Sequence, residues 1–567
     1  MRRLVEKVKT CRAELLILVC VCAVLSFWVS QKEGFHMDEM ISYEMANAQY
    51  NPWIVPTQPE GRLSKFVREE IDGENLGDTL GNLLFILRDT LENRGNSIIA
   101  NYKADVYEEP VWIDRQRFID YVTVDGDDAF NYLSVYFNFK DDNHPPLFQF
   151  ALHTVSSLFW GRIEAWMGCT VNIISVLGSC ILLMQLGKEL CGRREYGWMA
   201  AILYGGSAGA IATALLTRMY GMLTCFCLCE LYIHIGKWKK DDWKDHNKGM
   251  ILLTAAGFLT QYFFVLYMLG LALVTVVGLL RRKQKKETFC YIRSMVIAAV
   301  IGVGVYPFSI SHILSSGRGV DALSSLAQGF QGYGERMASF GRLLVSRFPG
   351  GIFGVTVFFL LLAATVVLLV RESRGGQKED MMPLWMLAVP LVVYFLLASK
   401  LSPFLVDRYI MPVFPLAALF LACLLAQVLE RIRFHRGVGL LAALVLAVIG
   451  SVSYDGEYLY RGYDEQLAVA KEYGELPCVC VYVGYGFYEN LLEFTEYEET
   501  LLVTAEELET RSEDGLLENG ERFVMLVKNG VDQAELESLL SEKYELSVSQ
   551  VLFTGGAHQD SVWLCQR

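Results

Sequence analysis

Side chains that could carry out acid–base chemistry stand at the ends of several hydrophobic segments of this chain. Adjacent carboxylates, Asp38 and Glu39, follow His36 a few residues beyond the first hydrophobic segment. A carboxylate held within hydrogen-bond reach of a hydroxyl can take its proton as a general base. Ionised groups gain nothing from apolar surroundings, so charges at membrane segments are costly and usually mark a functional site.

Three further polar stretches occupy comparable positions. They are "DDNHPPL" with His144, "LTRMYGML" with Arg218 and Tyr220, and "LVDRYIMP" with Arg408 and Tyr409. Arg and His can stabilise the negative charge that develops on a phosphate leaving group. Together, the four stretches favour the transfer of a group from a phosphate to a hydroxyl.

Taken one at a time, each stretch also has a purely structural interpretation. Asp38 could cap a surface helix, and the prolines after His144 could open one. Arg218 could extend to the lipid headgroups. Arg408 and Tyr409 could form an interfacial anchor.

The bulk composition indicates the class of protein that positions these residues. The 567 residues are 53% hydrophobic, with a mean hydropathy of +0.31, which exceeds a typical soluble composition. Several apolar runs approach the length that spans a bilayer, and we predict a polytopic α-helical membrane protein with about 11 to 13 transmembrane helices. The formal net charge of −13 argues against nucleic acid as a partner.

Basic clusters between the apolar runs predict the orientation in the membrane. The positive-inside rule places "GKWKK", "RRKQKK", "RESRGGQKED" and "RIRFHR" in the cytoplasm. The amino terminus is then cytoplasmic, and the carboxy-terminal region lies outside the cell (plasma) membrane. The apolar run 249–280 must form a hairpin that turns near "TQYFF".

The composition divides the chain into four parts. Residues 1–30 form the first transmembrane helix, and residues 31–143 form an extracytoplasmic loop with juxtamembrane helices and the acidic motif. Residues 144–453 form a multi-helix transmembrane domain. Residues 454–567 form a small soluble α/β domain outside the membrane, because "CVCVYVGYG", "RFVMLVKNG" and "LSVSQVLFTG" indicate strands and "DQAELESLLSEKY" indicates a helix capped by Asp532.

The order of these motifs resembles the GT-C class of membrane glycosyltransferases. The similarity is to the branch of protein O-mannosyltransferases and lipid A aminoarabinose transferases (glycosyltransferase family 39-like). Members begin with one helix, an acidic Asp-Glu motif and a long outer loop, followed by a "[HK]PPL" helix start; here these are "HMDEMISYEMA" and "HPPLFQF". Later "LTRMYGML", "TQYFF" and "RYIMPVFP" resemble further motifs of the class.

The resemblance implies that Asp38 is the catalytic base, with Glu39 supporting it or contacting the acceptor. It also implies that His144, Arg218 and Arg408 bind the donor phosphate. Candidates for other substrate contacts are His36, Tyr220, Gln261 and Tyr409. Gln261 stands where some members have histidine, which leaves its role open. The implied reaction moves a hexosyl or pentosyl group from a polyprenyl-phosphate sugar to a hydroxyl acceptor, with inversion.

No cofactor is expected, although a divalent metal stays an alternative because the Asp125–Asp128 and Asp141–Asp142 carboxylates offer oxygen ligands. The predicted partners are the polyprenyl-phosphate-linked sugar, an acceptor glycan, lipid or protein, and the bilayer. Two other classes of function stay open: a transporter or flippase for a lipid-linked substrate, and a non-catalytic membrane scaffold. Charges gathered at one face, without an internal repeat, favour the enzyme.

Overall fold

The computed structural model describes residues 2–50, 62–102, 110–140, 142–243, 247–314, 317–327, 329–372, 380–511, 515–517 and 521–567. The chain forms two compact units and passes between them several times. Unit 1 comprises residues 1–31, 141–148 and 168–457, and unit 2 comprises residues 32–140, 149–167 and 458–567. Asp141 and most of the "RESRGGQKED" loop lie outside the described residues.

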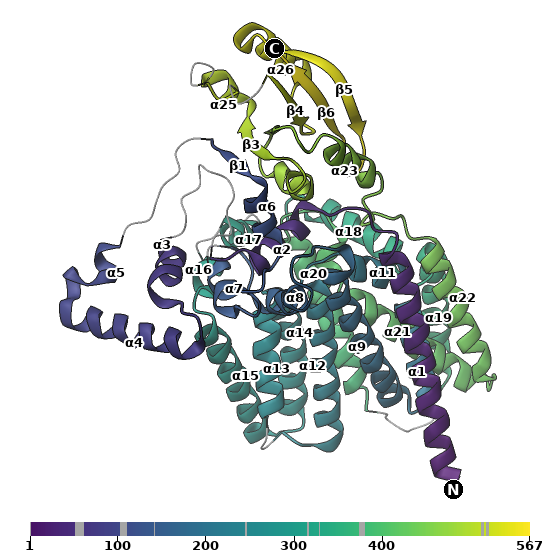
Figure 1. Cartoon of the computed structure of the whole chain (residues 1–567). Coiled ribbons are helices and arrows are strands. Elements are labelled where there is room, and N and C mark those ends of the chain that lie inside the picture. The colour runs from purple at the N-terminus through teal and green to yellow at the C-terminus, as the bar shows by residue number, and fades with distance from the viewer. Residues whose placement is uncertain are drawn as a thin grey trace. The chain divides into compact units, whose positions relative to one another are not determined.

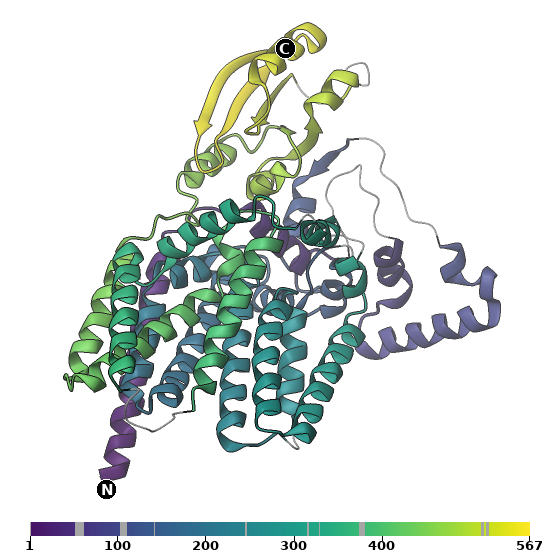
Figure 2. The same ribbon diagram turned by 180° about the vertical axis from the view of Figure 1, so that it is seen from behind.

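Unit 1 is a bundle of helices that run side by side in both views (Figures 1 and 2). Its helices are α1 (Arg2–Val29), α9 (Ala165–Cys191), α10 (Arg194–Gly205), α11 (Ala208–Leu215), α12 (Tyr220–Lys240), α13 (Lys248–Thr260), α14 (Phe264–Arg281), α15 (Lys285–Val305), α16 (Ser309–Leu314), α17 (Gly317–Ala327), α18 (Tyr333–Arg347), α19 (Gly351–Glu372), α20 (Met382–Leu401), η3 (Asp407–Ile410), α21 (Val413–Arg431) and α22 (Arg436–Val452).

Six helices of the described chain are long and apolar enough to cross a membrane: the part of α1 from Cys11 to Val29, α9, α14, α15, α20 and α21. The bent pairs α10–α11 and α18–α19 raise the number to eight if each pair is one span. This is fewer than the 11 to 13 spans expected from sequence, because that estimate includes runs that form short or broken helices. The chain is a polytopic helical membrane protein.

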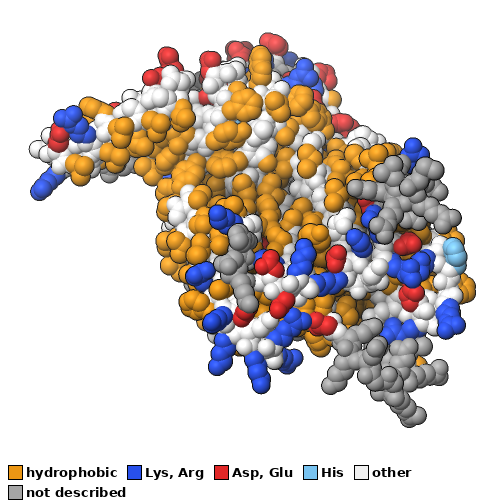
Figure 3. Space-filling model, turned by 90° about the horizontal axis from the view of Figure 1, so that it is seen from below, with side chains coloured by type: hydrophobic (Ala, Val, Ile, Leu, Met, Phe, Trp, Pro, Cys, Tyr) orange, Lys and Arg blue, Asp and Glu red, His pale blue; other side chains and the backbone are white. Residues whose placement is uncertain are grey.

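The hairpin predicted at "TQYFF" is confirmed, because α13 ends at Thr260 and α14 begins at Phe264. Helices α12, α14 and α21 carry basic residues in their last turns. Figure 3 shows Lys and Arg side chains on this end of unit 1. These are the helix ends that the positive-inside rule assigns to the cytoplasm.

Glycines allow helices α9 and α10 to pack closely. A Cβ added to Gly187 would lie 2.5 Å from the Cα of Gly197, and one added to Gly197 would overlap the carbonyl oxygen of Met184. Either addition would force two backbones apart. Gly304 in α15 differs, because an added Cβ there meets no heavy atom within 4 Å.

Gly197→Ala and Gly304→Ala should therefore change stability in opposite directions. We expect Gly197→Ala to destabilise the protein by about 1–3 kcal/mol through overpacking. Gly304→Ala should stabilise it by about 0.5–1 kcal/mol, because alanine restricts the unfolded chain and favours helix. Thermal unfolding of the detergent-purified variants measures both. An unchanged or raised melting temperature in Gly197→Ala would contradict the close packing of α9 and α10.

Unit 2 contains a six-stranded sheet in the order β1-β3-β2-β4-β6-β5. Its strands are β1 (Trp112–Asp114), β2 (Cys478–Tyr482), β3 (Glu499–Thr504), β4 (Arg522–Val527), β5 (Ser547–Gly555) and β6 (Asp560–Gln566). Strand β2 pairs in parallel with β3 and β4, and the other pairs are antiparallel. The central strand β2 is buried along its whole length, as expected for a strand covered on both faces. The three predicted strands are confirmed.

The helices of unit 2 surround this sheet or belong to the segments before it. They are α2 (Met37–Asn47), α3 (Arg62–Phe66), η1 (Val67–Ile71), α4 (Leu76–Asn93), η2 (Arg94–Asn96), α5 (Ile98–Asn101), α6 (Arg115–Val122), α7 (Tyr132–Asn138), most of α8 (Leu147–Leu158), α23 (Tyr463–Glu472), η4 (Gly486–Asn490), α24 (Leu491–Phe494), α25 (Ala505–Thr510) and α26 (Gln533–Tyr544). The predicted cap of α26 is confirmed, because Asp532 accepts hydrogen bonds from the first turn.

The first loop and the carboxy-terminal region fold together. Strand β1, from residues 31–143, pairs with β3, from residues 454–567. The Arg115 guanidinium donates to the carbonyl oxygens of Gly474 and Tyr497, at 2.8 and 2.9 Å. From sequence we expect two separate domains here, whereas in the structure these segments belong to one unit.

Helix α4 exposes a row of leucines. Residues Leu76, Leu80, Leu83, Leu84, Leu87 and Leu91 share one face and are 37–79% exposed. Hydrophobic side chains along α4 are visible at the left of Figure 3. Such a helix, apolar on one face and polar on the other, is typical of segments that lie in a membrane interface.

Candidate functional site

A cavity of about 280 Å³ lies within unit 1 where several helices end. The loop before α8, the turn between α13 and α14, helices α16 and α17, the end of α20 and the 3₁₀ turn η3 contribute to it. Its polar lining residues are Asn143, His144, Gln261, Tyr262, His312, Arg318 and Tyr409; its apolar lining includes Val265, Leu266, Leu401 and Pro403. The structure thus brings three predicted site residues, His144, Gln261 and Tyr409, to one cavity.

Gln261 stabilises the turn that places it in the cavity. Its side-chain oxygen accepts a hydrogen bond from the backbone N–H of Phe263. The carbonyl end of the amide is therefore engaged, and the NH₂ group is the end that can donate to a ligand. A glutamine can serve an anion here as a donor.

Two lining residues, His312 and Arg318, are absent from the sequence prediction. The Nδ1 atom of His312 lies 3.0 Å from the hydroxyl of Tyr262, and His312 is buried. Both residues come from the segment between the apolar runs 290–309 and 350–370. Nothing in the sequence of that polar segment distinguishes His312 and Arg318 from solvated loop residues.

The environment of His144 is set by neighbouring charges. Its backbone N–H donates to Oδ2 of Asp142 at 3.1 Å, and its Nδ1 lies 2.9 Å from the same oxygen. Burial would raise the pKa of Asp142, but His144 and Arg218 outweigh that effect and hold it well below its usual range. Burial, together with Arg218 and Arg318, lowers the pKa of His144, although Asp142 opposes this.

These charges determine what His144 can do. With Asp142 ionised, the imidazole Nδ1–H donates to the carboxylate, so Nε2 is an acceptor in the neutral ring. An anion approaching Nε2 would favour the protonated ring, which then donates from both nitrogens. The arrangement suits a ligand that brings its own negative charge.

Tyr409 is the centre of an aromatic group in unit 1. Its ring contacts those of Tyr220 and Phe263, with centroids 5.9 and 5.7 Å apart. The guanidinium carbon of Arg408 lies 5.5 Å from the centre of the Tyr409 ring, and Tyr394 donates a 3.0 Å hydrogen bond to the Tyr409 carbonyl. Tyr220, Arg408 and Tyr409 therefore lie in one neighbourhood of unit 1.

Arg347, which the sequence analysis does not single out, holds η3 in place. Its Nε donates to Asp407 at 2.5 Å, and its Nη1 donates to both oxygens of Asp455 at 2.9 and 3.0 Å. A further ion pair joins it to Glu457. Arg347 and Asp407 are buried. Because Asp407 precedes Arg408 and Tyr409, the Arg347 clamp orients the turn that carries them.

The acidic motif forms the start of helix α2 in unit 2. His36 is the N-cap: its Nδ1 accepts the Asp38 N–H at 3.1 Å, and its own N–H donates to Glu39 Oε2 at 2.9 Å. His36 Nδ1 lies 3.6 Å from the Asp38 carboxylate, but it cannot donate there while it accepts the Asp38 amide hydrogen. The structure thus excludes the interpretation in which Asp38 caps the helix.

Glu39 has different partners from Asp38. Its Oε2 accepts a 3.0 Å hydrogen bond from Lys32, and both side chains of this pair are fully buried. Together with the capping bond to His36, this contact engages Glu39 with the protein itself. The arrangement favours a supporting role for Glu39 over direct contact with an acceptor.

A buried polar cluster supports the α/β part of unit 2. Lys528 donates to Asp560 at 2.9 Å and to Glu489 at 3.0 Å. Asn490 donates to both Glu493 oxygens, at 3.1 and 2.9 Å, and to Asp560 at 3.1 Å. Burial, reinforced by Asp560, raises the pKa of Glu493 to about 8, against the hydrogen bonds from Asn490 that lower it.

Glu230 and His234 are buried inside unit 1, and neither was predicted as a functional residue from the sequence. Glu230 in α12 accepts a 2.7 Å hydrogen bond from Thr254 in α13. His234, one turn later, has Nε2 3.1 Å from the hydroxyl of Tyr291 in α15. These contacts join three helices, and polar bonds of this kind hold membrane helices together.

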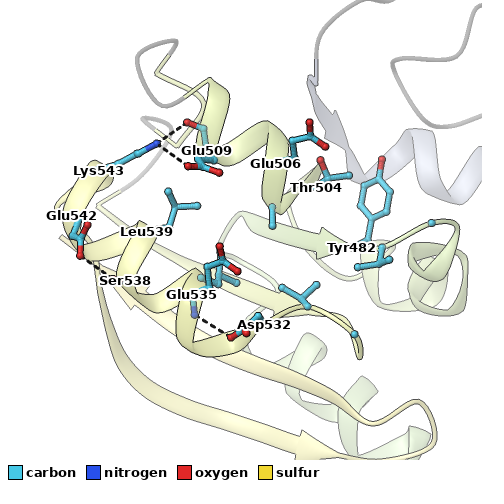
Figure 4. A pocket seen from close by; sticks show the side chains of 16 residues that line it. Tyr482, Thr504, Glu506, Glu509, Asp532, Glu535, Ser538, Leu539, Glu542 and Lys543 are labelled. Carbon is cyan, nitrogen blue, oxygen red and sulfur yellow. Dashed lines mark hydrogen bonds and ion pairs between the residues drawn. The ribbon is translucent and has the colours of Figure 1, made fainter.

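A cavity of about 680 Å³ in unit 2 opens at the carboxyl ends of the parallel strands β2, β3 and β4. Figure 4 shows its rim, where Glu506, Glu509, Glu535 and Glu542 are labelled and Lys543 pairs with Glu509. The excess of carboxylates would repel a phosphate. Among the two cavities, the one in unit 1 is suited to an anionic ligand.

Within the described part of the chain, no three His, Cys, Asp or Glu side chains are grouped to hold a metal ion. The predicted base and its neighbours, His36, Asp38 and Glu39, belong to unit 2. The predicted phosphate ligands, His144, Arg218 and Arg408, belong to unit 1. A single site formed by both sets stays a prediction.

A family model described as dolichyl-phosphate-mannose-protein mannosyltransferase matches residues 143–307 of the chain. The matched segment contains His144, Arg218 and Gln261. No match was found among the curated proteins.

Three solved membrane-protein structures are similar to this chain, the first of them with a TM-score above 0.5. The crystal structure of ArnT from Cupriavidus metallidurans bound to undecaprenyl phosphate aligns with 97% of this chain and 97% of that chain, at 12% identity and a TM-score of 0.51. The apo structure of ArnT from the same organism covers 80% and 93%, at 13% identity and a TM-score of 0.47. The oligosaccharyltransferase AglB from Archaeoglobus fulgidus covers 93% and 71%, at 10% identity and a TM-score of 0.43. The chain therefore resembles the GT-C membrane proteins of the ArnT and protein mannosyltransferase type.

The raised pKa of Glu493 predicts how stability depends on pH. Between its ordinary value of 4.5 and about 8, folded Glu493 holds a proton that the unfolded chain releases. Its contribution to stability is therefore complete at low pH and decreases as pH rises through this window. Glu493→Gln should flatten the fall in melting temperature between about pH 5 and 8. An unchanged pH profile in this variant would contradict the protonated state of Glu493.

Proposed function

We propose that this protein is a membrane glycosyltransferase that moves a sugar from a polyprenyl-phosphate donor to a hydroxyl acceptor. The observation that carries the proposal is the unit 1 cavity, where Arg318, His144 and His312 line the same space as Leu266 and Leu401. A polyprenyl-phosphate sugar has the same two chemical parts, an anionic head and an apolar tail. Charge-assisted hydrogen bonds would bind the head.

The comparisons support the same class of donor. The ArnT structure similar to this chain holds undecaprenyl phosphate, and the matched family is described as using dolichyl-phosphate mannose. Both molecules are polyprenyl phosphates. The sugar and the acceptor for this chain are not specified by either comparison.

We assign the role of general base to Asp38. The acceptor oxygen attacks the anomeric carbon and forms the new C–O bond, while the bond from that carbon to the phosphate oxygen breaks. Asp38 takes the hydroxyl proton, and the donor phosphate leaves as an anion stabilised by His144, Arg218 and Arg318. A single displacement of this kind inverts the anomeric configuration.

The reaction is proposed for the outer face of the plasma membrane, with a cytoplasmic amino terminus. The basic last turns of α12, α14 and α21 support this orientation. The leucine face of α4 supports a juxtamembrane position for the loop that carries the acidic motif. No step of the proposed reaction requires a metal.

A transporter remains the rival class, since Glu230 and His234 place ionisable groups inside the bundle. Both have hydrogen-bond partners on neighbouring helices, which accounts for them as structural contacts. Transfer of radiolabelled sugar from a purified polyprenyl-phosphate donor by the reconstituted protein separates the enzyme from the transporter.

Asp38→Asn should reduce the rate of sugar transfer by about 10²–10⁴-fold, as expected for loss of a general base. Because His36 and Glu39 form the cap, the substitution should change the free energy of unfolding by no more than about 1 kcal/mol. Transfer assays and thermal unfolding on the same preparation measure the two effects. Undiminished transfer by a stable variant would remove Asp38 from the mechanism.

Arg318→Gln and His144→Gln should each weaken the binding of a polyprenyl-phosphate sugar by about 10- to 100-fold, the range for a lost hydrogen bond to a charged group. Isothermal calorimetry in detergent gives the affinity. Arg342→Gln is the matched control, because Arg342 lies in α18 and donates to Ser339 outside the cavity. Equal donor affinity in Arg318→Gln, His144→Gln and Arg342→Gln would show that the phosphate binds elsewhere.

A further inference from the structure

Two segments of unit 2 from opposite ends of the chain hold each other at the base of the acidic motif. We call residues 32–36 and 458–463 the clasp. The backbone N–H of Glu33 donates to the Leu459 carbonyl at 2.9 Å, and the Glu33 carboxylate accepts from the Gly462 N–H at 2.6 Å. The first segment leads into helix α2, and the second leads into the α/β domain.

Lys32 is the charged centre of the clasp. Its ammonium donates to Glu39 Oε2 at 3.0 Å and to the carbonyl oxygen of Tyr458, 426 residues away in sequence, at 2.8 Å. It also lies 4.9 Å from the centre of the Tyr460 ring. A single buried cation thus joins the acidic motif to the segment that begins the α/β domain.

The backbone of the clasp shows that its two segments pack closely against each other. Tyr460 has a φ of +50°, a conformation that is unfavourable for a bulky residue and persists only where its surroundings impose it. Gly34 lies against the same segment, and a Cβ added there would be 2.8 Å from Tyr463 and 3.0 Å from Tyr460. Only glycine permits this approach.

The clasp is connected to the body of the α/β domain. The Tyr460 ring stacks on His558, with centroids 5.5 Å apart and planes inclined by 27°. His558 Nδ1 lies 3.4 Å from Glu489, which pairs with Lys528 on the sheet. Contacts therefore continue from the acidic motif through Lys32 and Tyr460 to the buried polar cluster of the domain.

We propose that the C-terminal α/β domain, through the clasp, positions the acidic motif for the reaction, and that Lys32 and Gly34 are positioning residues. The effect on transfer rests on the proposed function, whereas the effect on helix α2 does not. Lys32 donates to the same Glu39 oxygen that accepts the His36 N–H, so it holds Glu39 in the position that completes the His36 cap. The cap in turn determines the direction in which helix α2 presents Asp38.

The test uses the full-length protein and two readouts. In Lys32→Met, Glu39 loses its buried partner, so amide hydrogen exchange in α2 should become faster. Transfer should decrease by about 100-fold, the effect of displacing a catalytic group by about 1 Å. Gly34→Ala should act in the same direction by separating the two segments. Affinity for the polyprenyl-phosphate sugar should stay within twofold of wild type, because neither residue lines the unit 1 cavity.

A double variant distinguishes positioning from a direct role in the reaction. Lys32→Met with Glu39→Gln removes both buried charges, so exchange in α2 and transfer should recover relative to Lys32→Met alone. Lys543→Met is the matched control, since this lysine is exposed and pairs with Glu509 elsewhere in the α/β domain. It should leave exchange in α2 and transfer unchanged.

The outcomes separate this proposal from the proposed function. Exchange in α2 that is unchanged in both Lys32→Met and Gly34→Ala would overturn the clasp, whatever the transfer rates. Faster exchange in α2 with full transfer would show that the clasp orders the helix but does not position a catalytic group, which also overturns the proposal. If Asp38→Asn is fully active, the assigned base is wrong, and exchange in α2 still tests the clasp as a structural link.

Discussion

The cost of burying charge governs how the polar parts of this protein are arranged. An unpaired ion in a protein interior is unfavourable by several kcal/mol, so a buried charge needs a partner within hydrogen-bond distance. Lys32 pairs with Glu39, Arg347 with Asp407, and Lys528 with Asp560. Each pair also joins separate elements: Arg347 holds the η3 turn to α18, and Lys528 holds β4 to β6. The first two pairs hold the segments that carry Asp38 and Tyr409.

The same electrostatic constraint distinguishes the two cavities. The larger one, at the carboxyl ends of the parallel strands, has five carboxylates and one lysine among its lining residues and is unfavourable for a phosphate. The smaller one combines Arg318 and two histidines with leucine and proline side chains. An anionic head attached to an apolar chain matches only the second. This match in chemistry, together with the GT-C-type fold, leads to the proposal of a lipid-linked sugar donor.

Much of the architecture follows from local features of the sequence. The membrane helices, the hairpin turn at Gln261 and the strands and capped helix of the carboxy-terminal region depend on hydrophobic runs, periodicity and capping residues that are close together in the chain. His144 and Tyr409 were candidates from the sequence because polar groups next to membrane helices are costly wherever the chain goes, whereas Gln261 was a candidate only through the family resemblance. The number of membrane spans could not be read from the sequence, since a hydrophobic run does not show where its helix bends or breaks.

The sequence by itself determined that the chain is a membrane protein with an acidic motif beside its first helix. Only the tertiary structure brings distant groups to the candidate residues of each unit: Arg318 and His312 in the unit 1 cavity and Arg347 behind the η3 turn. In unit 2 it brings Lys32 into contact with residue 458. The tertiary structure also pairs β1 with the carboxy-terminal sheet, so that residues 31–143 and 454–567, which look like separate domains in the sequence, form one unit. The physical reason is the same in each case. The local sequence shows which charges and strand edges need a partner. Only folding brings together the distant segments that supply the partners.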